Sequence, residues 1–241
     1  MIIRTEYDAI CTAAAELQEP YSLELHVDIR QRLGTHIGGL FPLFKEAFPL
    51  TVAAMEMYWP APIAAFENYR QHWLIDFVCE HDNLNLYFAL RYKVEDTFGP
   101  DFDQSHAMLP SRWVELYRYF ESFVITPNSR RPLTWINTPF HYSGRREIED
   151  VFAERLNMKK RWGKQLADKL GVDHHYFNCW LFNDNQDALF LDEKRNDHKV
   201  YHLNGRRHED VVVLADPETK LDEYLAHVVA GGKPADFNWR D

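Results

Sequence analysis

The sequence predicts an α+β protein whose central, mostly antiparallel sheet is flanked by helices, with an additional α/β region on the N-terminal side. Several short stretches alternate apolar and polar residues, as a strand with one buried face does. Other stretches repeat apolar residues at helical spacing. From residue 177 onward, apolar stretches follow one another through short polar connections, which favours strands joined as hairpins.

The length and composition are those of an ordinary globular protein. The chain has 241 residues, of which 46% are hydrophobic and 27% charged, and this length suits one large domain or two small ones. The segment 98–107 is polar and contains Gly and Pro, so we place a candidate boundary there. The expected parts are an acidic N-terminal α/β region (1–100), which could be a separate subdomain, and an α+β domain (101–241).

The first part mixes helical and strand patterns. Residues 23–30 alternate cleanly and predict a strand with one buried face. The stretch 34–42 is rich in glycine and interrupts the pattern, but it lacks the spacing and the lysine of a phosphate-binding loop. The expected elements are, in order, a helix (4–17), a strand (23–30), two helices (43–58 and 61–71) and an antiparallel hairpin (72–93).

The second part begins and ends with a helix. Ser111 is a candidate N-cap of the first, and Gly171 ends a helical stretch that begins near residue 144. Asp216 and Pro217 mark the start of the last helix, because Asp caps well and Pro suits the first helical position. The expected elements are, in order, a helix (111–123), short strands and loops (122–142), a helix (144–170), four strands (177–182, 187–193, 198–203 and 209–215), a helix (217–230) and a tail (233–241).

The formal net charge is −10, and most of it lies in the first part. Residues 1–100 carry 7 Lys/Arg and 14 Asp/Glu, whereas residues 101–241 carry 20 and 23. A negative field repels nucleic-acid backbones and attracts basic partners, so we do not expect nucleic-acid binding. Neither a secretory signal pattern nor a long apolar run is found, so we expect a cytoplasmic protein without membrane contact. The three widely spaced cysteines fit reduced, buried thiols.

The acid-rich stretch 178–203 raises the question of a metal or catalytic site. Asn183, Asn185 and Asp187 alternate like the start of a calcium loop, but the turn glycine and the final glutamate of such a loop are absent. The histidines lack zinc-binding spacing, and no serine lies in a nucleophile elbow. Polar residues at 183–187 suit a hairpin turn instead. We expect no catalytic group, metal or cofactor, and a protein that acts through its surface.

Three stretches of the second part resemble the SUKH superfamily, the Smi/Knr-like fold common among bacterial toxin-immunity proteins. The segment 109–120 resembles the family's Leu-Pro followed by an aromatic-rich helix. The segment 179–203 resembles its apolar strand, polar turn and second strand, and 211–229 resembles its closing strand and helix. The resemblance covers roughly residues 85–230 and leaves the rest of the chain as an addition.

The resemblance implies a cytoplasmic protein that binds and neutralises a cognate bacterial toxin, often a nuclease or another toxic enzyme. An acidic surface would meet a basic toxin quickly and block its substrate cleft. The expected contacts are exposed acids in the turns between the last strands, with Tyr201 as an aromatic anchor, whereas a core position is expected for Trp180. These acids are Asp184, Asp187, Asp192 and Glu193.

Two other functions stay open. The first is a hydrolase or transferase whose site would need a deep pocket where its catalytic groups converge. Its candidate residues are His174, His175, Cys179 and His198. The second is a regulatory adaptor without a toxin partner, which a large exposed apolar patch would favour. The sequence leaves the oligomeric state open.

Overall fold

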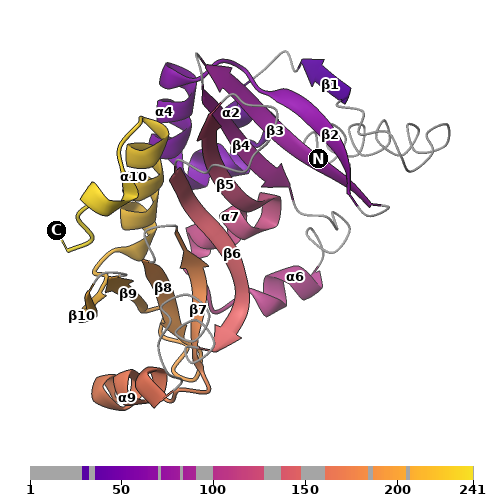
Figure 1. Cartoon of the computed structure of the whole chain (residues 1–241). Coiled ribbons are helices and arrows are strands. Elements are labelled where there is room, and N and C mark those ends of the chain that lie inside the picture. The colour runs from indigo at the N-terminus through magenta and orange to yellow at the C-terminus, as the bar shows by residue number, and fades with distance from the viewer. Residues whose placement is uncertain are drawn as a thin grey trace.

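A computed structural model of the chain describes most residues from 29 onward (Figure 1). The described stretches are 29–32, 36–69, 72–81, 84–90, 100–127, 137–147, 161–183, 187–204 and 207–240. The predicted helix 4–17 and most of the predicted strand 23–30 lie outside them. So do Asp184 and residues 148–160 of the predicted helix 144–170.

The described strands form one ten-stranded sheet in which each strand pairs with its neighbours in sequence. Every pair is antiparallel, which is the usual pairing of strands that are neighbours both in sequence and in the sheet. The strands are β1 (Ile29–Arg32), β2 (Ile63–Tyr69), β3 (His72–His81), β4 (Leu84–Leu90), β5 (Phe120–Pro127), β6 (Asn137–Glu147), β7 (Phe177–Phe182), β8 (Ala188–Asp192), β9 (Val200–Asn204) and β10 (Arg207–Val213). The predicted α+β fold with an antiparallel sheet is confirmed.

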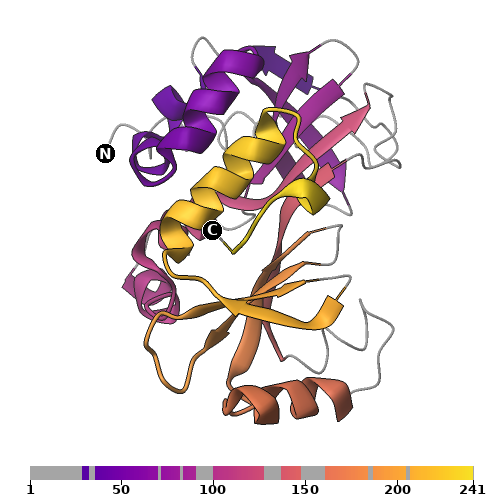
Figure 2. The ribbon, with the colours of Figure 1, turned by 90° about the vertical axis from the view of Figure 1, so that its left-hand side faces the viewer.

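Helices from both ends of the described chain pack together against this sheet. Figure 2 shows α10 lying beside the helices that precede β2. The helices are α2 (Ile37–Leu40), α3 (Pro42–Ala47), α4 (Pro49–Tyr58), α6 (Pro100–Ser105), α7 (Ser111–Tyr119), α9 (Arg161–Leu170), α10 (Pro217–Val229) and the short 3-10 helix η1 (Pro234–Asp236). None of the described helices is long and apolar enough to cross a membrane.

The main core is aromatic and joins elements that are far apart in sequence. Phe44 of α3 contacts Phe120 of β5 edge-on, with ring centroids 5.0 Å apart. Tyr117 of α7 meets Trp180 of β7 in the same way at 5.5 Å, and its hydroxyl donates to the Trp180 carbonyl at 2.5 Å. Leu221 and other buried residues of α10 complete this core. Because it contains side chains from both sides of residue 100, the described core crosses the predicted division of the chain into 1–100 and 101–241, which stays a prediction.

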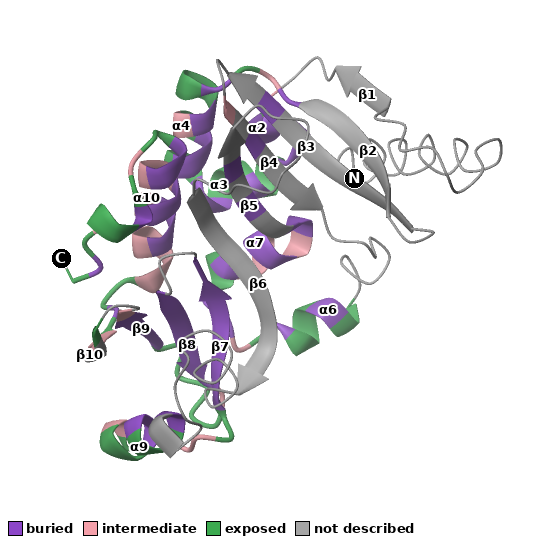
Figure 3. Ribbon diagram, viewed as in Figure 1, coloured by how far each residue is buried: buried purple, intermediate pink, exposed green. Residues whose placement is uncertain are grey.

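A smaller second core lies on the opposite face of β7–β9 (Figure 3). Leu166 and Ala167 of α9 cover this face, against Phe177, Phe190 and Tyr201. The two cores bury both faces of β7 and β8, and every residue of these two strands is buried. Strands buried on both faces read as continuous apolar runs, which explains the lack of alternation in this part of the sequence.

Two predicted connections and one predicted helix are wrong in the described residues. The prediction of a helix over 61–71 fails because Ile63–Tyr69 is strand β2, which pairs with both β1 and β3. Its Ala-rich sequence favours a helix, but the sheet hydrogen bonds outweigh that preference. The segment 98–107, predicted as a loop or linker, contains α6. The segment 233–241, predicted as a tail, contains η1 and the buried Trp239.

Two helix boundaries also differ from the prediction. Residues 144–147 belong to strand β6 and not to a helix. Ser111 does not cap α7 with its own side chain, because the N-cap position is Pro110. The start of the last helix is as predicted: Pro217 is its first residue, and the Asp216 carboxylate accepts from the Thr219 amide at 3.0 Å.

Candidate functional site

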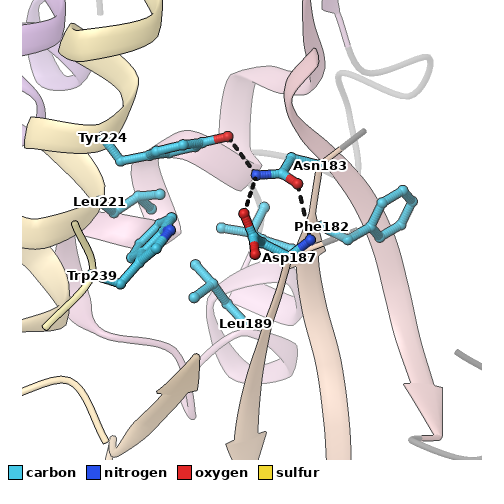
Figure 4. Close-up of a pocket in the computed structure, with 8 residues that line it drawn as sticks. Phe182, Asn183, Asp187, Leu189, Leu221, Tyr224 and Trp239 are labelled. Atoms are coloured by element: carbon cyan, nitrogen blue, oxygen red, sulfur yellow. Dashed lines mark hydrogen bonds between the residues drawn. The ribbon is translucent and has the colours of Figure 1, made fainter. Parts of the chain in front are cut away.

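A buried polar cluster lies where the β7–β8 hairpin meets α10 (Figure 4). It combines an amide, a carboxylate, an imidazole, a phenol and an indole, and each of these five side chains is at least nine-tenths buried. Polar groups removed from water need partners within the protein. We name this group the Asp187 cluster, and its members are Asn183, Asp187, His202, Tyr224 and Trp239.

Asn183 ties the hairpin to α10. Its backbone amide donates to the Asp187 carbonyl at 3.1 Å, and its side-chain oxygen accepts from the Asp187 amide at 3.0 Å. Its side-chain nitrogen lies 2.7 Å from the Tyr224 hydroxyl and 3.3 Å from the Asp187 carboxylate. An asparagine that bonds back to its own turn fixes the hairpin, so this residue sets both the turn and its distance from α10.

His202 and Trp239 close the other side of the cluster. His202 lies on β9 opposite Leu189 of β8, and its Nε2 atom is 3.5 Å from an Asp187 carboxylate oxygen. The Trp239 indole stacks on the His202 ring, with centroids 4.8 Å apart and planes 16° apart. Trp239 also contacts the Tyr224 ring at 4.7 Å. The indole therefore covers an Asp–His pair that would otherwise face solvent.

A small pocket remains beneath Trp239. Figure 4 shows Trp239, Leu189 and the Asp187 carboxylate facing one another across it. Its lining is apolar apart from a few polar groups, and it has room for about one water molecule. Sites for drug-sized ligands are much larger, with volumes of about 300–1,000 Å³. As it stands, the pocket is too small for a substrate.

The chemistry of the cluster is that of a shielded Asp–His pair. In hydrolases such a pair positions an imidazole that takes a proton from a serine or cysteine. Among the described residues, no serine, threonine or cysteine hydrogen-bonds to His202. Cys179 lies in the second core, on the other face of β7, and its thiol donates to the Leu181 carbonyl. The described geometry therefore does not assemble a nucleophile on this pair.

Two of the acids predicted to bind a partner are buried, whereas the sequence led us to expect exposed side chains. The expectation that Asp187 and Asp192 are exposed is wrong: their side chains are buried, Asp187 in its cluster and Asp192 beneath the turn that follows β8. Asp192 accepts there from the backbone amides of Lys194 and Arg195 at 3.2 and 3.3 Å. The Asp192 carboxylate is buried because the turn that follows β8 needs an acceptor for its own amides.

Two other predicted contact residues, Tyr201 and Glu193, are also fully or partly buried. Tyr201 is buried in the second core and cannot anchor a partner as placed. Glu193 is half-buried and accepts from the Trp180 indole at 3.2 Å. Trp180 is buried, as expected. Asp184 lies outside the described residues, so its role as a contact stays a prediction.

The residues considered for an enzymatic site lie in different settings. His174 and His175 stack on each other in the loop before β7, with ring centroids 3.8 Å apart. His198 is exposed in the loop between β8 and β9, and its Nδ1 atom is 3.2 Å from the Met108 carbonyl. In the described part of the chain, no three His, Cys, Asp or Glu side chains are grouped so that they could hold a metal ion.

Acidic side chains also occur on α3, α6 and α7, which carry four carboxylates and the three basic residues Lys45, Arg112 and Arg118. Asp103 of α6 pairs with Arg118 at 2.6 Å, and Glu115 lies 3.3 Å from the same guanidinium. Burial raises the pKa of Glu115, and the nearby carboxylates of Asp103 and Glu46 raise it further, against the lowering effect of Arg118. Asp101 on the first turn of α6 is exposed as well. We name this surface the α3–α7 acidic face, made of Glu46, Asp101, Asp103 and Glu115.

The sequence analysis did not identify most members of the Asp187 cluster or of the α3–α7 acidic face. His202, Tyr224 and Trp239 are separated along the chain, and no motif links them. One signal was available: Trp239 and Phe237 are large aromatics in a segment that looked like a tail, and such residues are rarely left in solvent. The acidic character of the first part was recognised, but the pairing of α3 with α6 and α7 depends on tertiary contacts.

Comparison with known proteins gives no relative: no family model, no curated protein and no solved structure matches this chain.

Proposed function

We propose that this chain is an immunity-type protein of the cytoplasm, which binds and neutralises a basic bacterial toxin through an acidic surface. The resemblance of residues 85–230 to the SUKH superfamily suggests this role, and the net charge of −10 is consistent with a basic partner. An antiparallel sheet backed by a final helix is also in keeping with that resemblance. Fold alone does not establish function, so the argument depends on the surface.

The observation that carries the proposal is the α3–α7 acidic face. The carboxylates of Asp103 and Glu115 pair with one guanidinium there, and Glu46 on α3 and Asp101 on α6 add exposed negative charge. The raised pKa of Glu115 reports the mutual repulsion of these groups as well as burial. A cationic partner would relieve that repulsion, which favours fast, salt-sensitive association. This face replaces Asp187 and Asp192 as the proposed contact surface.

The test begins with the partner. The tagged chain is used to capture proteins from the native bacterial lysate at low and at moderate salt, and the captured proteins are identified by mass spectrometry. The proposal predicts one basic, toxic protein that is lost as salt rises. Recovery of no such protein, from cells shown to express candidate toxins, contradicts the proposal.

The surface is tested by a pair of charge reversals. Glu46→Lys with Asp101→Lys should weaken binding of the captured partner by at least about tenfold and flatten its salt dependence. Asp168→Lys with Asp197→Lys makes the same change in net charge elsewhere, on α9 and in the β8–β9 loop, and should change binding by less than about threefold. Equal losses in both variants would show that net charge and not this face is responsible.

An adaptor role is the second candidate, because α4 exposes an apolar face. Leu50, Met57 and Tyr58 are 47%, 73% and 48% exposed, and their spacing places them on one side of the helix. Exposed apolar groups of this kind are common at protein interfaces. A partner captured equally well at both salt concentrations, and lost on Met57→Glu, would favour the adaptor over the immunity role.

A further inference from the structure

The segment that follows α10 forms one wall of the pocket beneath Trp239. Residues 233–240 turn back along α10 after a pair of glycines (Figure 2). Gly231 has a φ of +95°, and a Cβ atom at Gly232 would lie 2.3 Å from the His227 ring. Because both positions are glycine, the chain can make this turn and place the indole over the pocket.

Three aromatic contacts fix the Trp239 ring. Its indole stacks on the His202 ring with planes 16° apart, and it contacts the rings of Tyr224 and Phe237 at 4.7 and 5.0 Å. A ring that is packed closely on several sides cannot turn without displacing its neighbours. The direction of the indole N–H bond is therefore set by packing.

The N–H group of Trp239 points into the pocket. Its Nε1 atom is buried and has no hydrogen-bond partner among the described residues. Figure 4 shows the nitrogen edge of the indole directed toward the Asp187 carboxylate, with the pocket between them. A buried donor without a partner is unfavourable, and native structures seldom keep one. The position opposite this N–H group therefore calls for an acceptor.

The polar groups around the pocket select the chemistry of an occupant. The Trp239 indole can only donate a hydrogen bond, and an ionised carboxylate such as that of Asp187 can only accept one. A metal ion or an ammonium ion cannot accept from an indole, and the carboxylate repels an anion. A water molecule does both, because it accepts and donates. The pocket has room for about one water molecule, and all eight residues that line it are buried.

We propose that this pocket is a binding site for one ordered water molecule, which accepts from the Trp239 indole and donates to the Asp187 carboxylate. A buried water needs about two to four polar partners, and the amide of Asn183 lies on the same wall as Asp187. The water links the last segment of the chain to the β7–β8 hairpin. The proposal does not depend on the immunity role, because the pocket does not belong to the α3–α7 acidic face.

The test is water-selective NMR spectroscopy of the full-length chain with isotope-labelled tryptophan. The indole resonance of Trp239 is assigned by its loss in Trp239→Phe. A bound water should give a cross-peak between this indole proton and water, with opposite signs in the laboratory frame and in the rotating frame. A cross-peak with the same sign in both frames reports exchange of the indole proton itself. That result, or no cross-peak, overturns the proposal.

The hydroxyl group of Tyr224 also lines the pocket and exchanges its proton with the solvent, so it is the first control. In Tyr224→Phe the cross-peak should remain, because the indole and the carboxylate still hold the water. Loss of the cross-peak in this variant would assign the signal to the hydroxyl proton and overturn the proposal.

A matched pair of core variants tests the position of the water. Leu189 and Leu191 both lie on β8 in the main core, but of the two only Leu189 lines the pocket. Methionine fills irregular gaps, and the exchange of leucine for methionine is well tolerated. Leu189→Met should therefore fill the pocket and abolish the cross-peak, whereas Leu191→Met should keep it. A cross-peak that survives in Leu189→Met, or that both variants lose, would show that this pocket does not hold the water.

Discussion

At the residue scale, single carboxylates decide where helices of this protein begin. Asp222 lies on α10, is 2% exposed and accepts from the backbone amides of Leu50 and Thr51 at 3.0 and 2.8 Å. It also accepts from the Thr51 hydroxyl at 2.7 Å. The first amides of a helix have no partner within it. The N-cap residue of α4, Phe48, has no side-chain acceptor, so a residue far away in sequence accepts from these amides instead. The charge also suits the positive end of the helix.

The first prediction concerns Asp222→Ala. The change removes the acceptor of the Leu50 and Thr51 amides, while the Thr51 hydroxyl keeps the backbone carbonyl of residue 222 at 3.2 Å. It should lower the free energy of unfolding by about 3 kcal/mol. Urea denaturation followed by circular dichroism measures the loss. Glu223→Ala, at the next position but half-exposed, is the matched control and should cost less than about 1 kcal/mol. Similar losses in both variants would mean that Asp222 does not cap α4.

The second prediction concerns the pH dependence of the Asp216 cap. Its hydrogen bond from the Thr219 amide holds the pKa of this carboxyl below its ordinary value of 3.8. The native state therefore favours the charged form, so the cap contributes fully above pH 3.8 and is lost as pH falls through the lower native pKa. Asp216→Ala should cost about 1 kcal/mol at pH 7, and the difference should shrink below pH 3.8.

Asp216→Asn provides the control for that experiment. Asparagine caps about as well as aspartate and does not titrate. Unfolding curves between pH 2.5 and 7 should give this variant nearly wild-type stability at pH 7 and a constant advantage over Asp216→Ala. If Asp216 contributed the same free energy to wild-type stability at every pH, the lowered pKa would be contradicted.

The third prediction concerns the buried thiols. Burial raises the pKa of the Cys79 thiol to about 12, and Cys179 is buried as well. Only the thiolate reacts, so both should be inert at neutral pH. In a Cys11→Ser background, Ellman's reagent should label the native chain far more slowly than the urea-unfolded chain, which should release two equivalents. Rapid labelling of the native chain would show that these strands open readily.

At the element scale, α10 is the helix that joins the two parts of the chain. Glu218 lies one turn before Asp222 on the same face, and its carboxylate accepts from the Ser111 hydroxyl and the Arg112 amide at 2.7 and 3.0 Å. It thus caps α7 as Asp222 caps α4. The Trp59 indole also donates to the Val229 carbonyl at 2.8 Å, near the other end of α10. Two carboxylates of α10 therefore accept from the first amides of α7 and α4.

The fourth prediction follows from this arrangement. Ala226→Pro breaks α10 near its C-terminal end, four residues after Asp222, and should cost about 3 kcal/mol or more. Because α10 holds α4 and α7, the loss should lower the stability of the whole described core and not of the last helix alone. Ala226→Gly is the milder control and should cost about 1 kcal/mol. Hydrogen exchange that shows faster exchange only within 217–229 would contradict a shared core.

Element types were largely predictable from the sequence, whereas the capping of α7 was not. The hairpin of β3 and β4, the strands β7–β10 and the capped start of α10 follow from local patterns. The capping of α7 was assigned to Ser111, because local rules cannot include a carboxylate that arrives from residue 218. The strand at Ile63–Tyr69 was missed for the same reason, since its stability comes from two neighbouring strands.

The candidate sites were less predictable than the fold. The acids near the β7–β8 and β8–β9 turns were identified in sequence, but their exposure was inferred from their polarity. Asp192 is buried because its turn needs a side-chain acceptor, and Asp187 is buried where its carboxylate accepts from the Asn183 side chain. His202 and Trp239, the more distant members of the Asp187 cluster, are brought to it by strand register and by the packing of residues 233–240. Neither can be read from spacing.

At the scale of the whole molecule, the shared core predicts a single unfolding transition. Trp59 and Trp180 both belong to the main core, although they lie on opposite sides of residue 100. In a chain labelled with fluorotryptophan, their resonances, assigned by Trp→Phe variants, should disappear at the same urea concentration. Separate midpoints would support the division at residues 100 and 101 as two independently stable domains.

The position of the α4 cap has a consequence for synthesis of the chain on the ribosome. Thr51 and Asp222 are 171 residues apart, and translation adds about 5–20 residues per second. The first helices are therefore synthesised on the order of ten to thirty seconds before the carboxylate that caps α4. During that interval the apolar surfaces of α3 and α4 are without α10, which makes the nascent chain a natural client for chaperones that hold exposed hydrophobic segments.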